Sequence, residues 1–210
     1  RDSVRERDLD NFLVEELSSS DDFRDWLLSR ITTDFLPPRS SDIRVRKSPV
    51  RASLDGRQTD VELGWFSGGE QLACLLLESK IADDFQTGQA ESYLSEVQAQ
   101  LCKLGPKRAA AVLVAPVGKM ASLQHNGAFA ADVTIEEIIA FLESRLEDLE
   151  EGELSRRLSV RIELLEALAG KRASSGWVAS TVAEKKDFAK AYEQLASEIL
   201  PDARVRPSTN

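Results

Sequence analysis

Two apolar runs constrain the fold of this chain more than any other feature of its sequence. The segments "QLACLLLES" (71–79) and "RAAAVLVAP" (108–116) carry apolar residues at consecutive positions, without alternation of polar and apolar side chains. A strand with one face in water alternates, so each run indicates a strand buried on both faces. Strands of this kind lie in sheets that carry helices on each side. The chain is therefore predicted to have an α/β fold.

The segments around these runs predict a mixed sheet. Residues 88–104 show apolar side chains at helical spacing and end at "GP", so a helix joins the two apolar strands as a parallel crossover. The preceding β-favouring segment, "RQTDVELGWF" (57–66), is separated from the first apolar run by "SGGE" (67–70). Glycines in that position favour a tight hairpin turn, which makes this pair of strands antiparallel. Both strand directions are therefore expected in one sheet.

Amphipathic periodicity predicts helices at both ends of the chain. They cover 8–17, 21–31, 134–149, 153–170 and 181–200. Thr134 and Glu137 have the spacing of a capping box at the start of the third of these helices. A further β-favouring segment spans 42–53. We expect a core at 1–150 and a C-terminal helical extension at 151–210 that packs on it.

Composition indicates a soluble, cytoplasmic protein without a membrane partner. Hydrophobic residues make up 42% of the 210 positions, which is enough for a sizeable core. No apolar stretch reaches about 18 residues, and the N-terminus lacks the pattern of a signal peptide. Cys74 and Cys102 lie in apolar segments without metal-ligand spacing, so both are expected to be small core residues in a reducing compartment.

Charge is distributed unevenly along the chain. The net charge of −9 argues against a nucleic-acid partner, because polyanions are bound by Lys and Arg. The segment 39–57, however, contains six basic residues and two acidic ones. The basic residues are Arg39, Arg44, Arg46, Lys47, Arg51 and Arg57, and the acidic ones are Asp42 and Asp55. This basic run could follow a phosphate backbone, or it could be ordinary solvated surface.

Two opposite charges end the first apolar strand, where turn residues are more usual. Glu78 and Lys80 are two residues apart and so share one face of the strand. Asp60 lies across the predicted hairpin, where its carboxylate can approach Glu78; Glu62 lies on the same face as Asp60 and is the alternative second acid. Two convergent carboxylates can hold a hard cation such as Mg²⁺, and a nearby lysine can orient an attacking water. These residue types suit hydrolysis of a phosphodiester.

The helix that follows supplies two more polar side chains for the same place. Gln89 and Tyr93 are four residues apart and so lie on one helical face, with Gln86 as a nearby alternative to Gln89. Other chemistries have little support in the sequence. His125 is the only histidine, and no Gly-rich phosphate loop followed by Lys and Ser/Thr occurs.

Taken together, "TD" (59–60), "ESK" (78–80) and "QAESY" (89–93) resemble the PD-(D/E)XK nuclease superfamily, in its RecB-like branch with a Q-x-x-x-Y motif. The resemblance covers residues 8 to about 145. It implies a restriction-endonuclease-like mixed sheet flanked by helices, to which this chain adds C-terminal helices. Thr59 stands where the motif has proline.

The resemblance also implies a function and the residues that perform it. It predicts a metal-dependent nuclease that hydrolyses nucleic acid, with DNA favoured as substrate and Mg²⁺, or alternatively Mn²⁺, as cofactor. It assigns Asp60 and Glu78 to metal binding and catalysis, Lys80 to catalysis, and Gln89 and Tyr93 to substrate binding or support of the site. It places a further metal-ligating acid on the first helix. Glu15 is the candidate for that acid, and Glu16 is the alternative.

A second interpretation belongs to a different functional class. The same fold without catalysis would serve as a module that binds nucleic acid or protein. A homodimer, or further domains of a longer protein, are open for either interpretation. Dependence of activity on Mg²⁺ or Mn²⁺ separates the nuclease from the binding module.

Overall fold

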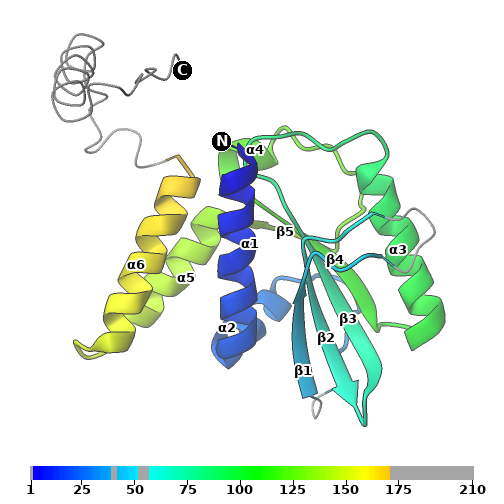
Figure 1. Ribbon diagram of the computed structural model, residues 1–210, viewed down its shortest axis with the longest axis horizontal. Helices are drawn as coiled ribbons and strands as arrows, with labels where there is room; N and C mark the ends of the chain where they lie inside the picture. The colour runs from blue at the N-terminus through cyan, green and yellow to red at the C-terminus, as the bar shows by residue number, and fades with distance from the viewer. Residues whose placement is uncertain (1, 39–41, 52–56, 171–210) are drawn as a thin grey trace, which may run out of the picture. The chain divides into compact units, whose positions relative to one another are not determined.

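A computed structural model describes residues 2–38, 42–51 and 57–170. These residues form an α/β structure with one five-stranded sheet in the order β1-β2-β3-β4-β5 (Figure 1). The strands are β1 (Asp42–Lys47), β2 (Val61–Ser67), β3 (Glu70–Ser79), β4 (Ala109–Ala115) and β5 (Ala131–Thr134). Strands β1, β2 and β3 pair antiparallel, whereas β3, β4 and β5 pair parallel. The predicted α/β class and mixed sheet are confirmed.

Helices cover both faces of this sheet (Figure 1). They are α1 (Asp2–Ser19), α2 (Asp21–Ser29), α3 (Gln89–Leu104), the short α4 (Val117–Met120), α5 (Ile135–Glu147) and α6 (Glu153–Leu168). In β3, Leu75 and Leu77 belong to one hydrophobic cluster with α1, α2, α5 and α6, whereas Leu76 packs in a second cluster with α3. Because successive side chains enter opposite layers, consecutive positions in the middle of the strand, 72–77, are apolar.

The hairpin between β2 and β3 turns on two glycines. Gly68 and Gly69 have φ of 59° and 88°, a region that residues with a Cβ rarely adopt. Positive φ at both central residues is the geometry of a type I′ turn, whose twist matches that of the flanking strands. The turn brings the start of β2 next to the end of β3, and this pairing determines where the predicted site residues lie.

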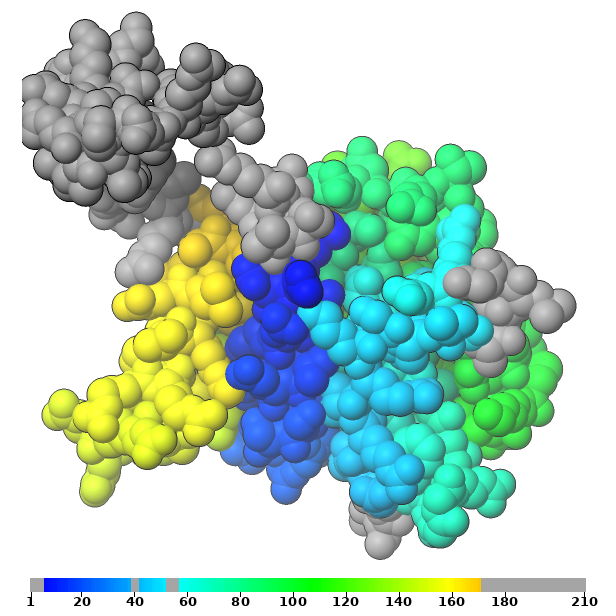
Figure 2. Space-filling view, in the orientation of Figure 1, coloured from blue at the N-terminus to red at the C-terminus, as the bar shows by residue number. Residues whose placement is uncertain are grey.

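Helix α6 shares its hydrophobic core with α1 and α5. Leu158, Ile162 and Leu165 are buried in the same cluster as Leu13 of α1 and Leu142 of α5. On the molecular surface, α1 forms a band between α6 and the strands at the β1 edge (Figure 2). The predicted helix at 181–200 lies outside the described residues, as do 171–180 and 201–210.

Three features differ from the sequence predictions. Strand β5 and helix α4 were not predicted, because each has only four residues and carries little periodicity. Cys102 was expected in the core but is exposed on α3, whereas Cys74 is buried as predicted.

Within the described part of the chain, every helix is too short or too polar to cross a membrane.

Candidate active site

The end of β3 carries the charged residues predicted for the site. Val61 of β2 pairs with Leu77 of β3, so Asp60 stands beside Glu78 at the next position of the hairpin. Asp60 Oδ2 accepts a hydrogen bond of 2.8 Å from the backbone N–H of Ser79. The backbone N–H of Lys80 donates to Val114 O of β4 at 2.9 Å, which keeps Lys80 in register with the sheet.

Glu78 is the centre of the site, and only 1% of its surface is exposed. Lys80 Nζ lies 2.9 Å from Glu78 Oε1. Two donors from α3 also reach this carboxylate: Gln89 Nε2 donates to Oε1, and the hydroxyl of Tyr93 donates to Oε2. The structure therefore brings Glu78, Lys80, Gln89 and Tyr93 into direct contact, with Asp60 beside them.

The start of α3 positions these two donors. Gly88, with φ of 71°, precedes the helix and lets the chain turn into it. Gln89 Oε1 accepts a bond of 3.0 Å from the backbone N–H of Gln86, so the amide of Gln89 is held at both ends. Gln86, the alternative to Gln89, contributes its backbone to this arrangement, and its side chain is exposed.

Burial and mutual repulsion perturb the acids at this site. Desolvation, then the charges on Glu78 and Asp10, raise the pKa of Asp60 from 3.8 to about 8. Burial alone would lower the pKa of Lys80, but the charge and hydrogen bond of Glu78 and the charges of Glu6 and Asp60 outweigh it, so its pKa is raised. A cation placed among these acids would relieve their repulsion.

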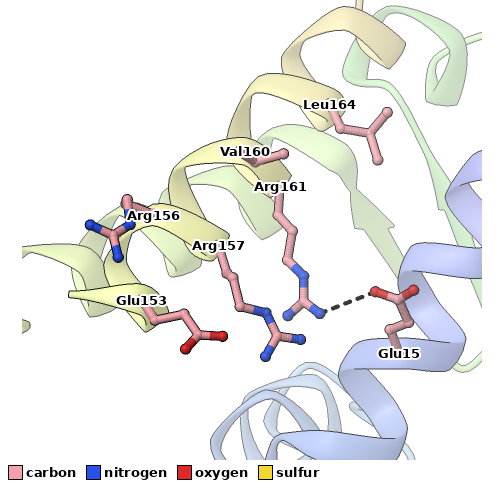
Figure 3. A pocket seen from close by; sticks show the side chains of 7 residues that line it. All are labelled: Glu15, Glu153, Arg156, Arg157, Val160, Arg161 and Leu164. Atoms are coloured by element: carbon pink, nitrogen blue, oxygen red, sulfur yellow. Dashed lines mark hydrogen bonds and ion pairs between the residues drawn. The ribbon is translucent and has the colours of Figure 1, made fainter.

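Glu15, the acid assigned to the metal from α1, does not lie at this site. Its carboxylate is exposed, and Oε2 lies 3.1 Å from Nη2 of Arg161 on α6 (Figure 3). The alternative, Glu16, is buried but also pairs with Arg161. Both side chains face α6, so neither joins Asp60 and Glu78. The structure therefore does not bring Glu15 or Glu16 together with the other predicted site residues.

Two other acids on α1 face the end of β3 instead. Glu6 Oε1 accepts a bond of 3.3 Å from the backbone N–H of Ile81, just beyond Lys80. Asp10, one turn later, is 8% exposed, and desolvation raises its pKa to about 6 despite the nearby Ser79 hydroxyl. Asp10 Oδ1 is buried without a hydrogen-bond partner among the described residues. Glu15 is five residues beyond Asp10, which turns it about 140° around the helix.

The carboxylates Asp60 and Glu78 suit a hard divalent cation. Mg²⁺ takes oxygen ligands, keeps several waters and commonly uses only one or two protein carboxylates. The buried, partnerless oxygen of Asp10 and the raised pKa of Asp60 are features that a cation would relieve. Within 2–38, 42–51 and 57–170, no three Asp, Glu, His or Cys side chains form a ready metal-ligand group. The carboxylates that this end of β3 offers to such a cation are those of Asp60 and Glu78.

Most side chains of the basic run that the structure describes are engaged within the protein. Arg46 Nη2 lies 2.5 Å from Glu62 Oε1, and Lys47 Nζ donates to Asn11 Oδ1 at 2.6 Å. Arg51 is buried, and its guanidinium lies over the ring of Tyr93, 3.7 Å from the centroid. Part of the run thus supports the site, while Arg44 and Arg46 keep about half of their side-chain surface in solvent.

Comparison with protein-family models, with curated proteins and with solved structures finds no match to this chain. A function for it therefore has to follow from the chemistry of its own residues.

Proposed function

We propose that this chain is a metal-dependent nuclease of the PD-(D/E)XK type, acting on nucleic acid and preferentially on DNA. One observation carries the proposal: Asp60, Glu78, Lys80, Gln89 and Tyr93, spread over 34 positions of sequence, meet at the end of β3. An accidental surface ion pair between Glu78 and Lys80 would not be buried, nor would it recruit two donors from a separate helix.

Each residue of the site has a role that its contacts support. Asp60 and Glu78 would hold Mg²⁺, or Mn²⁺ in its place, through carboxylate oxygens. The bound cation would supply Lewis-acid activation of the phosphodiester. Lys80 presents an ammonium beside both acids, where it can orient a water and offset charge on the phosphate in the transition state. Gln89 and Tyr93 hold the carboxylate of Glu78 in one orientation.

One observation favours the second candidate, a catalytically silent module with the same fold. Both oxygens of Glu78 are already hydrogen-bonded, by Gln89, Tyr93 and Lys80. A cation must therefore share this carboxylate with existing donors or displace one of them. In a binding module the same bonds would have only a structural purpose.

A cleavage assay separates the two candidates. Linear, circular and single-stranded DNA, together with RNA, are incubated with the protein and Mg²⁺ or Mn²⁺, and in parallel with chelator. The nuclease should cleave only with metal, and products from the circular substrate would identify endonucleolytic action. Absence of metal-dependent cleavage on all substrates would leave the binding module.

Metal binding is tested separately with Glu78→Gln, and Glu70→Gln at the exposed start of the same strand is the matched control. We expect Mg²⁺ to raise the melting temperature of the wild type and of Glu70→Gln, because a ligand that binds only the native state stabilises it by mass action. At one hundred times Kd this amounts to about 2.7 kcal/mol. Glu78→Gln should show no such increase, and an unchanged metal affinity in this variant would remove Glu78 from the site.

A further inference from the structure

A polar pocket lies between the sheet and α3. It has a volume of about 230 Å³ and includes Glu62 of β2, Leu76 of β3 and Glu96 of α3 in its lining. Glu62 pairs with Leu76, and Leu76 precedes Glu78 by two residues on the same face of β3. Two strand residues span roughly 7 Å, so the pocket lies one pleat away from the candidate active site.

The floor of this pocket consists of buried hydrogen-bond acceptors. Glu62, Glu96 and Gln100 are 6%, 1% and 7% exposed. Arg46 and Gln71 both donate to Oε1 of Glu62, and a carboxylate has further acceptor positions beyond the two that they use.

The side-chain amide of Gln100 contributes an unsatisfied acceptor, Oε1, to the floor. Its Nε2 donates to Glu96 Oε1 at 2.8 Å, which orients the amide, and its Oε1 is buried without a partner in the described chain. Leaving such an acceptor unsatisfied costs about 1–3 kcal/mol. An occupant with N–H donors would recover that free energy.

The mouth of the pocket, unlike its floor of acceptors, is basic and exposed. Arg46 and Lys103 line it with exposed basic side chains, and Val50 adds an exposed apolar surface. Arg51 forms a wall shared with the active site, because its Nε donates to Thr59 Oγ1 at 3.1 Å while its guanidinium lies over Tyr93. A ligand for this pocket therefore needs an anionic end at the mouth and N–H donors at the floor.

We propose that this pocket binds a nucleoside monophosphate unit, with the phosphate at Arg46 and Lys103 and the base edge at Glu62 and Gln100. Pockets for drug-sized ligands begin at about 300 Å³, so a volume of about 230 Å³ limits this pocket to a single small ligand. Guanine presents neighbouring imino and amino donors on one edge and satisfies two acceptors at once. Thymine has a single N–H donor on its base.

The proposal that the pocket binds a nucleotide does not depend on hydrolysis by this protein. Use of the pocket as a subsite, holding one nucleotide of the strand next to the scissile phosphate, rests on the proposed nuclease function. The experiment is therefore performed in chelator, where no metal-dependent cleavage occurs, so that a failure of the nuclease proposal and a failure of this one are distinguishable.

Calorimetric titration of the intact chain with dGMP, dAMP, dCMP and TMP tests the proposal. We expect saturable binding with one site, tighter for dGMP than for TMP. Gln100→Leu removes the floor acceptor and should weaken dGMP binding at least about tenfold, the usual scale for one lost hydrogen bond to a specific partner. Gln98→Leu, on the exposed face of the same helix, is the matched control and should bind dGMP like the wild type.

A second variant keeps the test informative if Gln100→Leu does not fold. Arg46→Gln changes a half-exposed side chain at the mouth and should weaken dGMP more than deoxyguanosine, which lacks the phosphate. Competition by a short oligothymidylate ending in one guanosine would assign the pocket to strand ends, and its absence would assign it to free mononucleotides. No saturable binding of any of the four nucleotides, TMP binding tighter than dGMP, or equal effects of Gln100→Leu and Gln98→Leu would each overturn the proposal.

Discussion

At the scale of single residues, Lys80 is a buried ammonium at the end of β3. Its side chain is 9% exposed, its ammonium lies 2.9 Å from Glu78, and the ring centroid of Phe85 is 5.8 Å from Nζ. A buried ammonium of this kind is costly unless an anion compensates it. The carboxylate of Glu78 therefore compensates the ammonium of Lys80 at the end of β3.

Replacing Lys80 tests the mechanism separately from the fold. Lys80→Ala removes the ammonium but no carboxylate, so this variant should still bind metal and nucleic acid while cleaving at least about a hundredfold more slowly. Lys80→Arg should not restore the rate, because a planar guanidinium differs in reach and geometry from an ammonium. Single-turnover cleavage in Mg²⁺ measures the effect. Near-normal turnover of Lys80→Ala would discard this lysine as the catalytic residue and leave the nuclease proposal standing.

The raised pKa of Asp60 predicts how stability depends on pH. Its pKa of about 8 exceeds the ordinary 3.8, so between these values the native state holds a proton that the unfolded chain has released. Stability in chelator should therefore fall as the pH rises from about 4 to about 8. Asp60→Asn can still accept the Ser79 N–H and should be more stable than the wild type near pH 8, by at least about 1 kcal/mol.

Urea denaturation of both proteins at intervals from pH 4 to about pH 8 measures this difference. Asp34→Asn, at a largely exposed carboxylate paired with Lys107, is the matched control and should change the pH dependence little. Parallel stability curves for the wild type and Asp60→Asn would mean that Asp60 is ionised in the native state over this whole range.

At the scale of elements, a shared arginine joins α1 to α6. Arg161 of α6 pairs with the buried Glu16 and with the exposed Glu15, so one guanidinium compensates a carboxylate inside the helix interface. Figure 3 shows the pair with Glu15. The apolar residues Leu158, Ile162 and Leu165 pack α6 into the core around it. The apolar contacts hold α6 against the core. The ion pairs of Arg161 orient the face of α1 that carries Glu15 and Glu16 toward α6.

Removing only one partner of the ion pair between Arg161 and Glu16 should lower the free energy of unfolding. Arg161→Met leaves the carboxylate of Glu16 buried and uncompensated, so we expect a loss of about 3 kcal/mol in the free energy of unfolding. Glu16→Leu combined with Arg161→Met removes both charges and should recover most of that loss. Glu15→Gln, which alters only the exposed half of the arrangement, should change stability by less than about 0.5 kcal/mol. Chemical denaturation measures all three, and equal losses in Arg161→Met and Glu15→Gln would contradict the assignment.

At the scale of the whole molecule, the net charge of −9 opposes binding of a polyanion. Exposed basic side chains on β1 can offset this locally, although Arg44 also pairs with Asp42 and Arg46 with Glu62. If the run contacts phosphates, replacing Arg44, Arg46 and Lys47 together with Gln should weaken DNA binding at low salt and make the dependence of log K on log salt shallower. An unaltered slope, measured by fluorescence anisotropy with uncleavable DNA or in chelator, would make the run ordinary solvated surface.

The sequence by itself determined the features that depend on local pattern. Consecutive apolar residues in 71–79 and 108–116 predicted strands buried on both faces, Gly68 and Gly69 predicted the hairpin, and Thr134 with Glu137 predicted the capping box that starts α5. The strand period predicted that Glu78 and Lys80 share one face of β3. The helical period predicted that Gln89 and Tyr93 share one face of α3. Because α3 directly follows β3, a short connection already brings these two pairs together.

Only the tertiary structure decided which way α1 faces and which residues line the pocket around Glu62 and Gln100. Glu6, Asp10, Glu15 and Glu16 are all acids on one helix, and their sequence does not state which of them meets β3. That choice depends on how α1 is rotated about its axis. Packing against the sheet and against α6 sets this rotation, and the residues of α6 lie more than a hundred positions away in sequence. The pocket around Glu62 and Gln100 likewise joins four separate elements, β1, β2, β3 and α3, so no local pattern could reveal it.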